Sequence, residues 1–133
     1  MPRNAFLLAV AALAALGACS TAPGTGWSRA SDLSVYGSMQ VFARAARDQD
    51  MLCAGFSRAS TDEYWQRKFG DRQAAVTEAL AARYGAAALA EADGTWAPRI
   101  ACGTVPDPQW RQRYERQLRL LENRLQTAGE GEG

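Results

Sequence analysis

Hydrophobic residues recur with the spacing of an α-helix in three stretches of the chain. The first stretch follows Asp32, which is a good N-cap residue, and it extends to Cys53, which lies on the same helix face as the hydrophobic residues before it. Steps of four, three and four residues separate the hydrophobic members of this face: Val35, Met39, Phe42 and Ala46. The pattern predicts an amphipathic helix that begins after Asp32.

The second stretch opens with Ser60 and Glu63, the spacing of a capping box, in which each side chain satisfies a free backbone N–H group. Gly70 interrupts the stretch, weakens the helix by about 1 kcal/mol relative to alanine and predicts a bend. Gly85 suits the position that ends a helix. Four large hydrophobic residues share one face of this second predicted helix: Trp65, Phe69, Val76 and Leu80.

A less regular segment separates the second stretch from the third. It begins with a short alanine-rich turn, AAALAEA, which Asp93 and Gly94 end. Residues 95–106 have no helical period and contain Pro98 and Pro106, so they are predicted to form an extended connector.

The third stretch has the clearest start signal in the chain. Asp107 is predicted as the N-cap and Pro108 as the first helical residue, and Gly129 is predicted to end the helix. A continuous hydrophobic stripe runs along one face: Trp110, Tyr114, Leu118, Leu121 and Leu125.

These patterns predict an all-α fold, a small three-helix domain over residues 32–127 with an extended connector, followed by a disordered tail over residues 128–133. Four aromatic residues from the second and third helices are expected to be buried together: Trp65, Phe69, Trp110 and Tyr114. A domain of roughly 95 residues has a marginal core, and a domain of this size often needs a covalent cross-link.

The first 18 residues have the layout of an export signal. Arg3 provides the positive charge, and the eleven apolar residues from Phe6 to Leu16 are too few to span a membrane, which takes about 20. Leu16-Gly17-Ala18-Cys19 resembles the lipobox of bacterial lipoproteins. The resemblance implies cleavage before Cys19, a lipid on its thiol and acylation of the new N-terminus; the alternative is an ordinary secretory signal with an incidental cysteine.

The same resemblance places the protein in the cell envelope. Ser20, rather than aspartate, follows the cysteine, which implies the outer membrane, with the domain facing the periplasm. Residues 19–31 are rich in small and polar residues and are predicted to be a flexible linker after the lipidated cysteine. Trp27 lies within this linker and either docks on the domain or rests in the membrane interface.

The chain has three cysteines, and lipidation of Cys19 leaves Cys53 and Cys102. In an exported chain these two are predicted to form a disulfide, with two separate buried thiols as the alternative. A metal site is not expected, because the chain has no histidine and two cysteines do not provide the four ligands of a structural zinc site. No cofactor is expected.

Catalytic signatures are sparse. The absence of histidine excludes histidine bases and histidine-containing triads. Carboxylate pairs remain as candidates for hydrolysis: Asp62, Glu63, Asp71 and Glu78. Glu63, Arg67 and Asp71 have the spacing of a surface ion-pair row, so the chain is predicted not to be an enzyme. Without Arg3 the acidic and basic residues balance at 14 each, and nucleic acid is not an expected partner.

The third helix carries two charged flanks. One flank alternates in sign, and its members are expected to pair among themselves: Arg111, Glu115, Arg119 and Glu122. The other flank has no acidic residue three or four positions away and is the candidate partner-binding stripe: Arg113, Arg116, Leu120 and Arg124. It predicts docking of an acidic envelope protein or an anionic lipid. The alternative is a solvated face, in a chain where all but one of the 15 basic residues are arginine.

The sequence thus predicts a lipid-anchored envelope protein with a non-catalytic role in interaction or scaffolding. Two other functions remain open: a peptidoglycan hydrolase that uses carboxylates, and a carrier that holds a small lipid between its helices.

Overall fold

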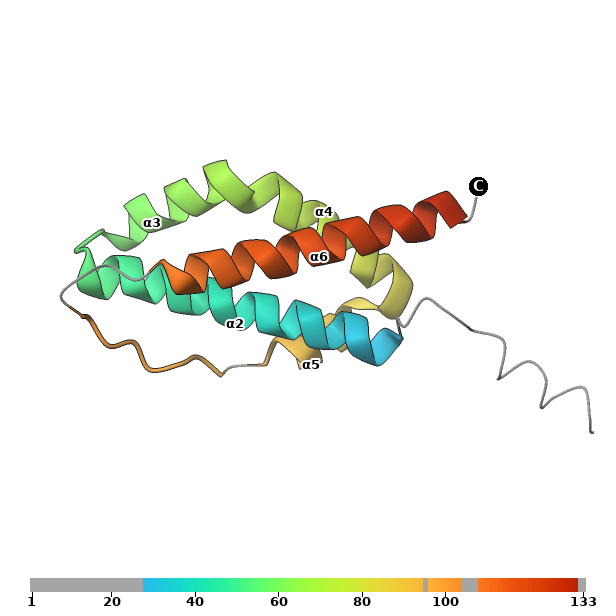
Figure 1. Ribbon diagram of the computed structural model, residues 1–133, viewed down its shortest axis with the longest axis horizontal. Helices are drawn as coiled ribbons and strands as arrows, with labels where there is room; N and C mark the ends of the chain where they lie inside the picture. Colours follow the sequence, from blue (N-terminus) through green and yellow to red (C-terminus); the bar gives the residue numbers. More distant parts are fainter. Residues whose placement is uncertain (1–27, 95, 104–107, 132–133) are drawn as a thin grey trace, which may run out of the picture.

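The computed structural model describes residues 28–94, 96–103 and 108–131, with side chains up to residue 128. The predictions for residues 1–27, including Cys19 and Trp27, and for Asp107 lie outside these residues. The described part is all-α and contains four helical rods (Figure 1). In chain order these are α2 (Arg29–Cys53), the continuous run of α3 (Arg58–Trp65), η1 (Gln66–Gly70) and α4 (Asp71–Tyr84), then α5 (Ala86–Asp93) and α6 (Gln109–Gly131).

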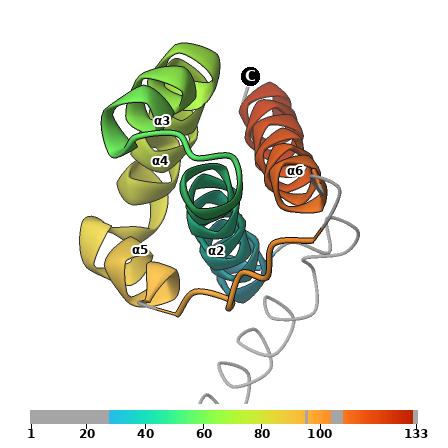
Figure 2. The ribbon, with the colours of Figure 1, turned by 90° about the vertical axis from the view of Figure 1, so that its left-hand side faces the viewer.

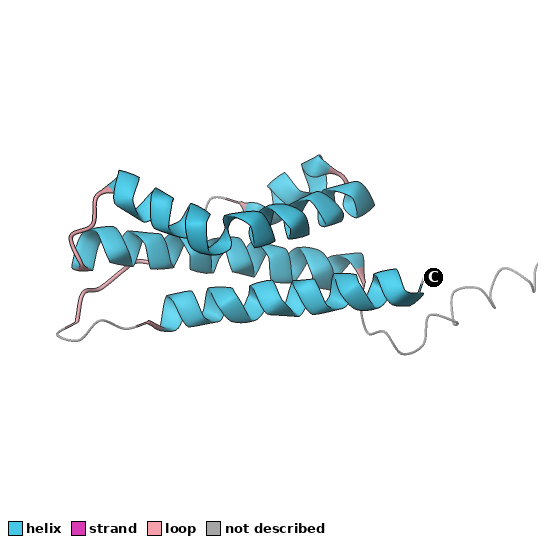
Figure 3. Cartoon of the chain, turned by 90° about the horizontal axis from the view of Figure 1, so that it is seen from above, coloured by secondary structure: helices cyan, strands magenta, loops and turns pink. Residues whose placement is uncertain are grey.

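α2 lies between α5 and α6, and the α3–η1–α4 rod lies above α5 and α2 and beside α6 (Figure 2). α2 and α6 run in opposite directions, so the start of α2 and the end of α6 lie at one end of the bundle (Figures 1 and 3). Because the lipobox-like motif precedes α2, we call this end the N-terminal end and the opposite one the distal end.

The helix α2 begins earlier than predicted. Ser28 is its N-cap, and the Ser28 side chain accepts a hydrogen bond from the backbone N–H of Ser31 at 3.1 Å. The prediction of Asp32 as N-cap was wrong: Asp32 lies in the first helical turn and is buried. Serine is as good an N-cap as aspartate, which leaves the Asp32 carboxylate for a contact inside the bundle.

The second predicted helix is continuous from Arg58 to Tyr84 but contains a π-helical turn. Ser57 caps its start by accepting from the backbone N–H of Ser60 at 3.1 Å, so the predicted capping box that begins at Ser60 is wrong. The π-helical turn ends at Gly70, where the sequence predicted an irregularity. The helix ends at Gly85, which has a φ angle of 93°. Glycine adopts this backbone conformation readily, whereas residues with a Cβ atom would be strained there.

The alanine-rich turn is a helix in its own right, which corrects the prediction of three helices to four. Alanine has the highest helix propensity, and Leu89 is buried against the bundle, so eight residues suffice to form α5. Gly37 allows α5 to approach α2 closely: a Cβ atom at Gly37 would lie 2.5 Å from the carbonyl oxygen of Ala92.

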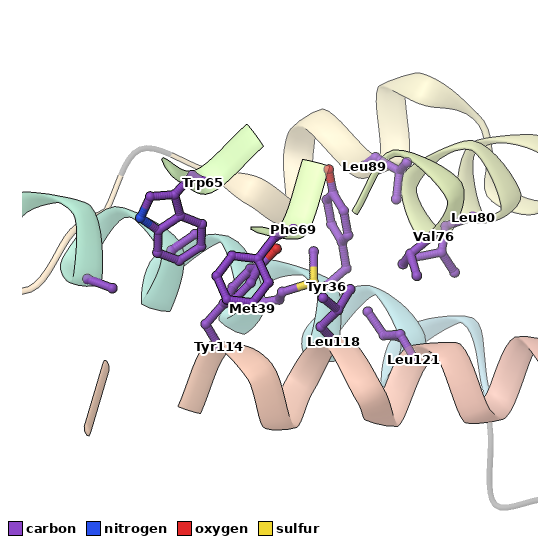
Figure 4. Packing of buried hydrophobic residues seen from close by; sticks show 12 residues of the cluster. Tyr36, Met39, Trp65, Phe69, Val76, Leu80, Leu89, Tyr114, Leu118 and Leu121 are labelled. Carbon is purple, nitrogen blue, oxygen red and sulfur yellow. The ribbon is translucent and has the colours of Figure 1, made fainter. Parts of the chain in front are cut away.

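The core is formed mainly by the faces that the sequence pattern predicted (Figure 4). Trp65, Phe69 and Tyr114 pack against one another with ring centroids 4.7 to 4.9 Å apart. Trp110 lies outside this group and packs against Phe42, at a centroid distance of 6.0 Å. The remaining large buried residues fill the space toward the N-terminal end: Tyr36, Met39, Val76, Leu80, Leu89, Leu118 and Leu121.

The last helix, α6, continues to Gly131, beyond the predicted end at Gly129, so residues 128–131 of the predicted disordered tail are helical. Residues 132–133 of that tail lie outside the described residues. Its start differs by one position from the prediction, because Pro108 precedes the first helical residue and its carbonyl accepts from the N–H of Gln112. The hydrophobic stripe of this helix faces the core as predicted.

The connector between α5 and α6 is extended in its described part, and the predicted disulfide holds it. Cys53 and Cys102 are bonded, with Cα atoms 5.3 Å apart, so the connector is tied to the distal end of α2. At its other end Arg44 donates hydrogen bonds to the carboxylate of Asp93 and, at 2.7 Å, to the carbonyl of Trp96.

Candidate functional site

The predicted partner-binding stripe does not lie on one surface, because Arg124 points into the bundle. Its side chain is 8% exposed and pairs with the Asp32 carboxylate, with 2.6 Å between Arg124 Nη1 and Asp32 Oδ1. The Tyr84 hydroxyl donates a short hydrogen bond to the same carboxylate. Arg124 is therefore removed from the predicted stripe: its partner comes from α2, 92 positions earlier in the chain, where helix spacing within α6 gives no hint of it.

The Asp32–Tyr84–Arg124 cluster joins α2, α4 and α6 at the N-terminal end of the bundle. Burial lowers the pKa of the Arg124 guanidinium, and the nearby Asp32 carboxylate opposes this shift. Burial, together with the hydrogen bond to Asp32, raises the pKa of Tyr84. Asp32, Tyr36 and Met39 are spaced by four and three residues, so the helical period did contain a signal that Asp32 faces the core.

The residues of the alternating flank do not pair among themselves as predicted. Each ion pair instead links α6 to another helix, at nitrogen–oxygen distances of 2.8 to 3.5 Å: Arg111 with Asp50, Glu115 with Lys68, and Glu122 with Arg72. The two acidic side chains between Gln109 and Ala128, Glu115 and Glu122, therefore form ion pairs on the side of α6 that faces η1 and α4.

Arg119, the fourth member of the alternating flank, faces solvent. There it lies beside three members of the predicted partner-binding stripe: Arg113, Arg116 and Leu120. Between Gln109 and Ala128, the exposed charged residues of α6 are Arg113, Arg116 and Arg119, and all are cationic. Leu120 lies among them and is 37% exposed. We call these four residues the α6 outer face. Arg113 also stacks over the ring of Trp110, 5.3 Å from its centroid, which fixes its side chain on this face.

Two of the carboxylates proposed for hydrolysis, Asp62 and Glu78, are too far apart along their helix to act as a catalytic pair. Asp62 and Glu78 line the same groove, but they are 16 residues apart on one continuous helix, or about 24 Å along its axis. Glycoside hydrolysis requires two carboxyl groups within about 10 Å. Asp62 also pairs with Arg47, and Glu63 lies 3.9 Å from Arg67 as the surface-row interpretation predicted.

Two open grooves flank α2. One lies between α2 and α5, has a volume of about 930 Å³ and includes Leu33, Val41, Phe42 and the largely exposed Trp96. The other, which we call the polar groove, lies between α2 and the α3–η1–α4 rod and has a volume of about 670 Å³. The sequence pattern did not predict either groove, because each is shaped by two elements that are distant in the chain.

Within the described part of the chain, no group of three or more histidine, cysteine, aspartate or glutamate residues is placed to hold a metal ion. None of the described helices is both long enough and apolar enough to cross a membrane. Comparisons of the chain with protein-family models, curated proteins and solved structures find no match.

Proposed function

We propose that this chain is a lipid-anchored protein of the bacterial cell envelope whose helical domain acts by binding rather than by catalysis. The observation that carries the proposal is the use of the three cysteines. The disulfide accounts for Cys53 and Cys102, and the third cysteine, Cys19, follows a hydrophobic segment in a sequence that resembles a lipobox.

The anchor is tested by Cys19→Ser. The wild-type chain is expected in the membrane fraction, with a mature N-terminus at Cys19 that carries acyl chains in mass spectra. The variant is expected to lose both the acyl mass and cleavage at this site, because lipidation requires the thiol. Wild-type protein with an unmodified N-terminus at another residue would contradict the proposal.

The α6 outer face supports anionic lipid headgroups as the partner of the domain. Ser28 comes nine positions after Cys19, so the tether reaches at most about 30 Å. α6 runs antiparallel to α2 along the bundle (Figures 1 and 3), and a tether of this length permits the helix to lie along the membrane. Arginine pairs bidentately with phosphate, and each basic residue near an anionic surface contributes about 1 kcal/mol.

A photo-crosslinking residue in place of Leu120, introduced in producing cells, tests this surface. The expected product is a phospholipid adduct, which decreases strongly when Arg116 and Arg119 are both changed to Glu. The same crosslinker at Ala75, an exposed position on α4, is the control and is expected to give little lipid adduct. If position 120 instead crosslinks to a protein, the partner of the α6 outer face is an acidic envelope protein rather than a lipid. If lipid adducts form equally at positions 120 and 75, the α6 outer face is a solvated surface that binds no specific partner.

The lipid-carrier alternative is favoured by one observation, the apolar lining of the groove between α2 and α5. Ala88 lies on the α5 side of this groove, and Ala88→Trp is designed to fill it. A carrier is expected to co-purify with a stoichiometric lipid that the variant lacks, as measured by mass spectrometry of the extracted protein. If the purified wild type and the variant contain the same amount of lipid, the groove does not carry lipid and this alternative is wrong.

A further inference from the structure

We propose that the polar groove binds an extended peptide segment of another protein. Small residues from both walls leave the space of this groove open: Ala43 from α2, and Gly70, Ala74 and Ala81 from the opposite rod. Polar bridges cross it: Arg47 of α2 pairs with Asp62 of α3, and the Gln73 side-chain amide donates to Gln40 at 3.5 Å. The proposal concerns the domain alone and holds whether or not the chain carries a lipid.

The first observation is a buried donor that lacks an acceptor. Trp65 lines the groove and is 5% exposed, and its indole Nε1–H has no hydrogen-bond partner. Its ring packs against Phe69 and Tyr114, and the nitrogen lies on the edge that points away from these two rings (Figure 4). Buried N–H groups are almost always paired, so this group calls for an acceptor such as a peptide carbonyl.

A second unpartnered donor belongs to Arg44, which lines the groove from α2. The Nε–H of Arg44 is buried without an acceptor, whereas the terminal nitrogens of the same guanidinium donate to Asp93 and to the carbonyl of Trp96. The guanidinium is therefore held in place from the α5 side. Unpartnered donors on lining residues of both walls favour a ligand that carries several acceptors along its length.

The π-helical turn presents a side-chain amide at the edge of this groove. A Cβ atom at Gly70 would lie 2.4 Å from the side-chain nitrogen of Gln66, so the absence of a side chain at Gly70 lets the Gln66 amide lie across the turn. Both residues line the groove. π-helical turns are rare and often occur at functional sites, which gives this irregularity a reason beyond packing.

Two further amides line the groove and are joined to each other and to two tyrosine hydroxyls by hydrogen bonds. The Tyr114 hydroxyl donates to Gln73, which donates to Gln40, which in turn donates to the Tyr36 hydroxyl at 2.8 Å. Each side-chain amide has the donor and acceptor set of a peptide group, and each NH₂ keeps a second hydrogen for a ligand. These amides match the alternating C=O and N–H groups of an extended backbone.

The dimensions of the groove and its one aromatic residue also favour a peptide. The lining residues on the α3–η1–α4 rod run from Asp62 to Ala81, which is about 28 Å along the helix axis and enough for about eight extended residues. Trp65 is the aromatic residue among the lining side chains, and its ring is packed into the core. A sugar ring would therefore find no exposed aromatic face in this groove.

Selection of random ten-residue peptides displayed on phage, against the full chain purified from producing cells, tests the proposal. Ala74→Trp fills the groove, and Ala75→Trp adds the same side chain at the next exposed position, which does not line the groove. Enriched peptides are expected to bind the wild type and Ala75→Trp equally and to lose more than tenfold affinity for Ala74→Trp. Thermal unfolding by circular dichroism checks that both variants fold.

Trp65→Phe provides the second test, because it removes the N–H group and keeps an aromatic ring. About tenfold weaker binding of the selected peptides is expected, which corresponds to the loss of one hydrogen bond. If Ala74→Trp does not fold, Gln66→Ala serves in its place with the same expected direction. The proposal is overturned if no peptide is enriched, if enriched peptides bind the filled groove equally well, or if the Ala74→Trp change instead abolishes binding of N-acetylglucosamine oligomers.

Discussion

Arg124→Leu is expected to be among the most destabilising single changes in the domain, because it leaves the Asp32 carboxylate buried without its counter-ion. The two side chains are 8% and 6% exposed, and their charged groups are 2.6 Å apart. Removal of one partner from a buried ion pair typically costs 3–5 kcal/mol, mostly through the penalty on the charge that stays behind. A domain of this size has about 5–15 kcal/mol in total, so the loss is a large part of its stability.

The loss in free energy of unfolding is measured from urea unfolding curves, recorded by circular dichroism with the disulfide intact. Arg116→Leu makes the same change at an exposed position of α6, and its expected effect is within about 0.5 kcal/mol. For Arg124→Leu, a loss of 3–5 kcal/mol corresponds to a decrease in melting temperature of more than about 12 °C.

The double variant Asp32→Leu with Arg124→Leu separates the burial of charge from the loss of packing. It removes both charges, and replacement of a buried ion pair by hydrophobic residues is often close to neutral. The double variant is therefore expected to be more stable than either single variant, despite a Tyr84 hydroxyl that loses its acceptor. A cost below 1 kcal/mol for Arg124→Leu, or additive effects of the two changes, would refute this reasoning.

Further predictions concern the distal end, the core and the α2–α5 contact. Reduction of the Cys53–Cys102 disulfide should lower the free energy of unfolding by about 4 kcal/mol, measured from urea curves with and without reductant. Burial raises the pKa of Tyr114, so its contribution to stability is complete below about pH 10 and is lost as the pH rises further; Tyr114→Phe should flatten the stability profile above pH 10. Gly37→Ala should lower stability by about 1–3 kcal/mol in thermal unfolding, although the same change in an open helix stabilises, because the added Cβ meets the Ala92 carbonyl.

Hydrophobic periodicity identified the long helices and most of the core, because every large residue of a buried face reports on the same period. Tyr114, Leu118 and Leu121 are all fully buried in α6, at the positions that the stripe predicts. The short α5 was missed because eight residues with a single buried leucine provide too little pattern to distinguish a helix from a turn.

The charged residues were the weak part of the sequence interpretation, because the partner of a charge depends on the tertiary fold. Arg111 and Glu115 are four positions apart, the spacing of a helical ion pair, yet they bind Asp50 and Lys68 on other helices. Arg124 has no acidic residue one turn away and is nevertheless paired, with Asp32. Local spacing alone therefore overestimates pairing on one flank of α6 and underestimates it on the other.

The distribution of these polar contacts indicates which part of the bundle is able to adapt to a ligand. The N-terminal end is held by the Asp32–Tyr84–Arg124 cluster, and the distal end is held by the disulfide and by the pair of Arg111 with Asp50. Between them, α2 and α4 are bridged by the 3.5 Å hydrogen bond of Gln40 with Gln73, at the long limit for such a bond. The π-helical turn and the unpartnered indole N–H of Trp65 lie on this same stretch. The Arg47–Asp62 ion pair also crosses the polar groove, so the long amide–amide bond is the weaker of the two polar bridges between its walls. Because a cleft opens most easily where its walls are least connected, a peptide that binds there is expected to separate the two amides, to accept from the indole and to leave the ion pair in place.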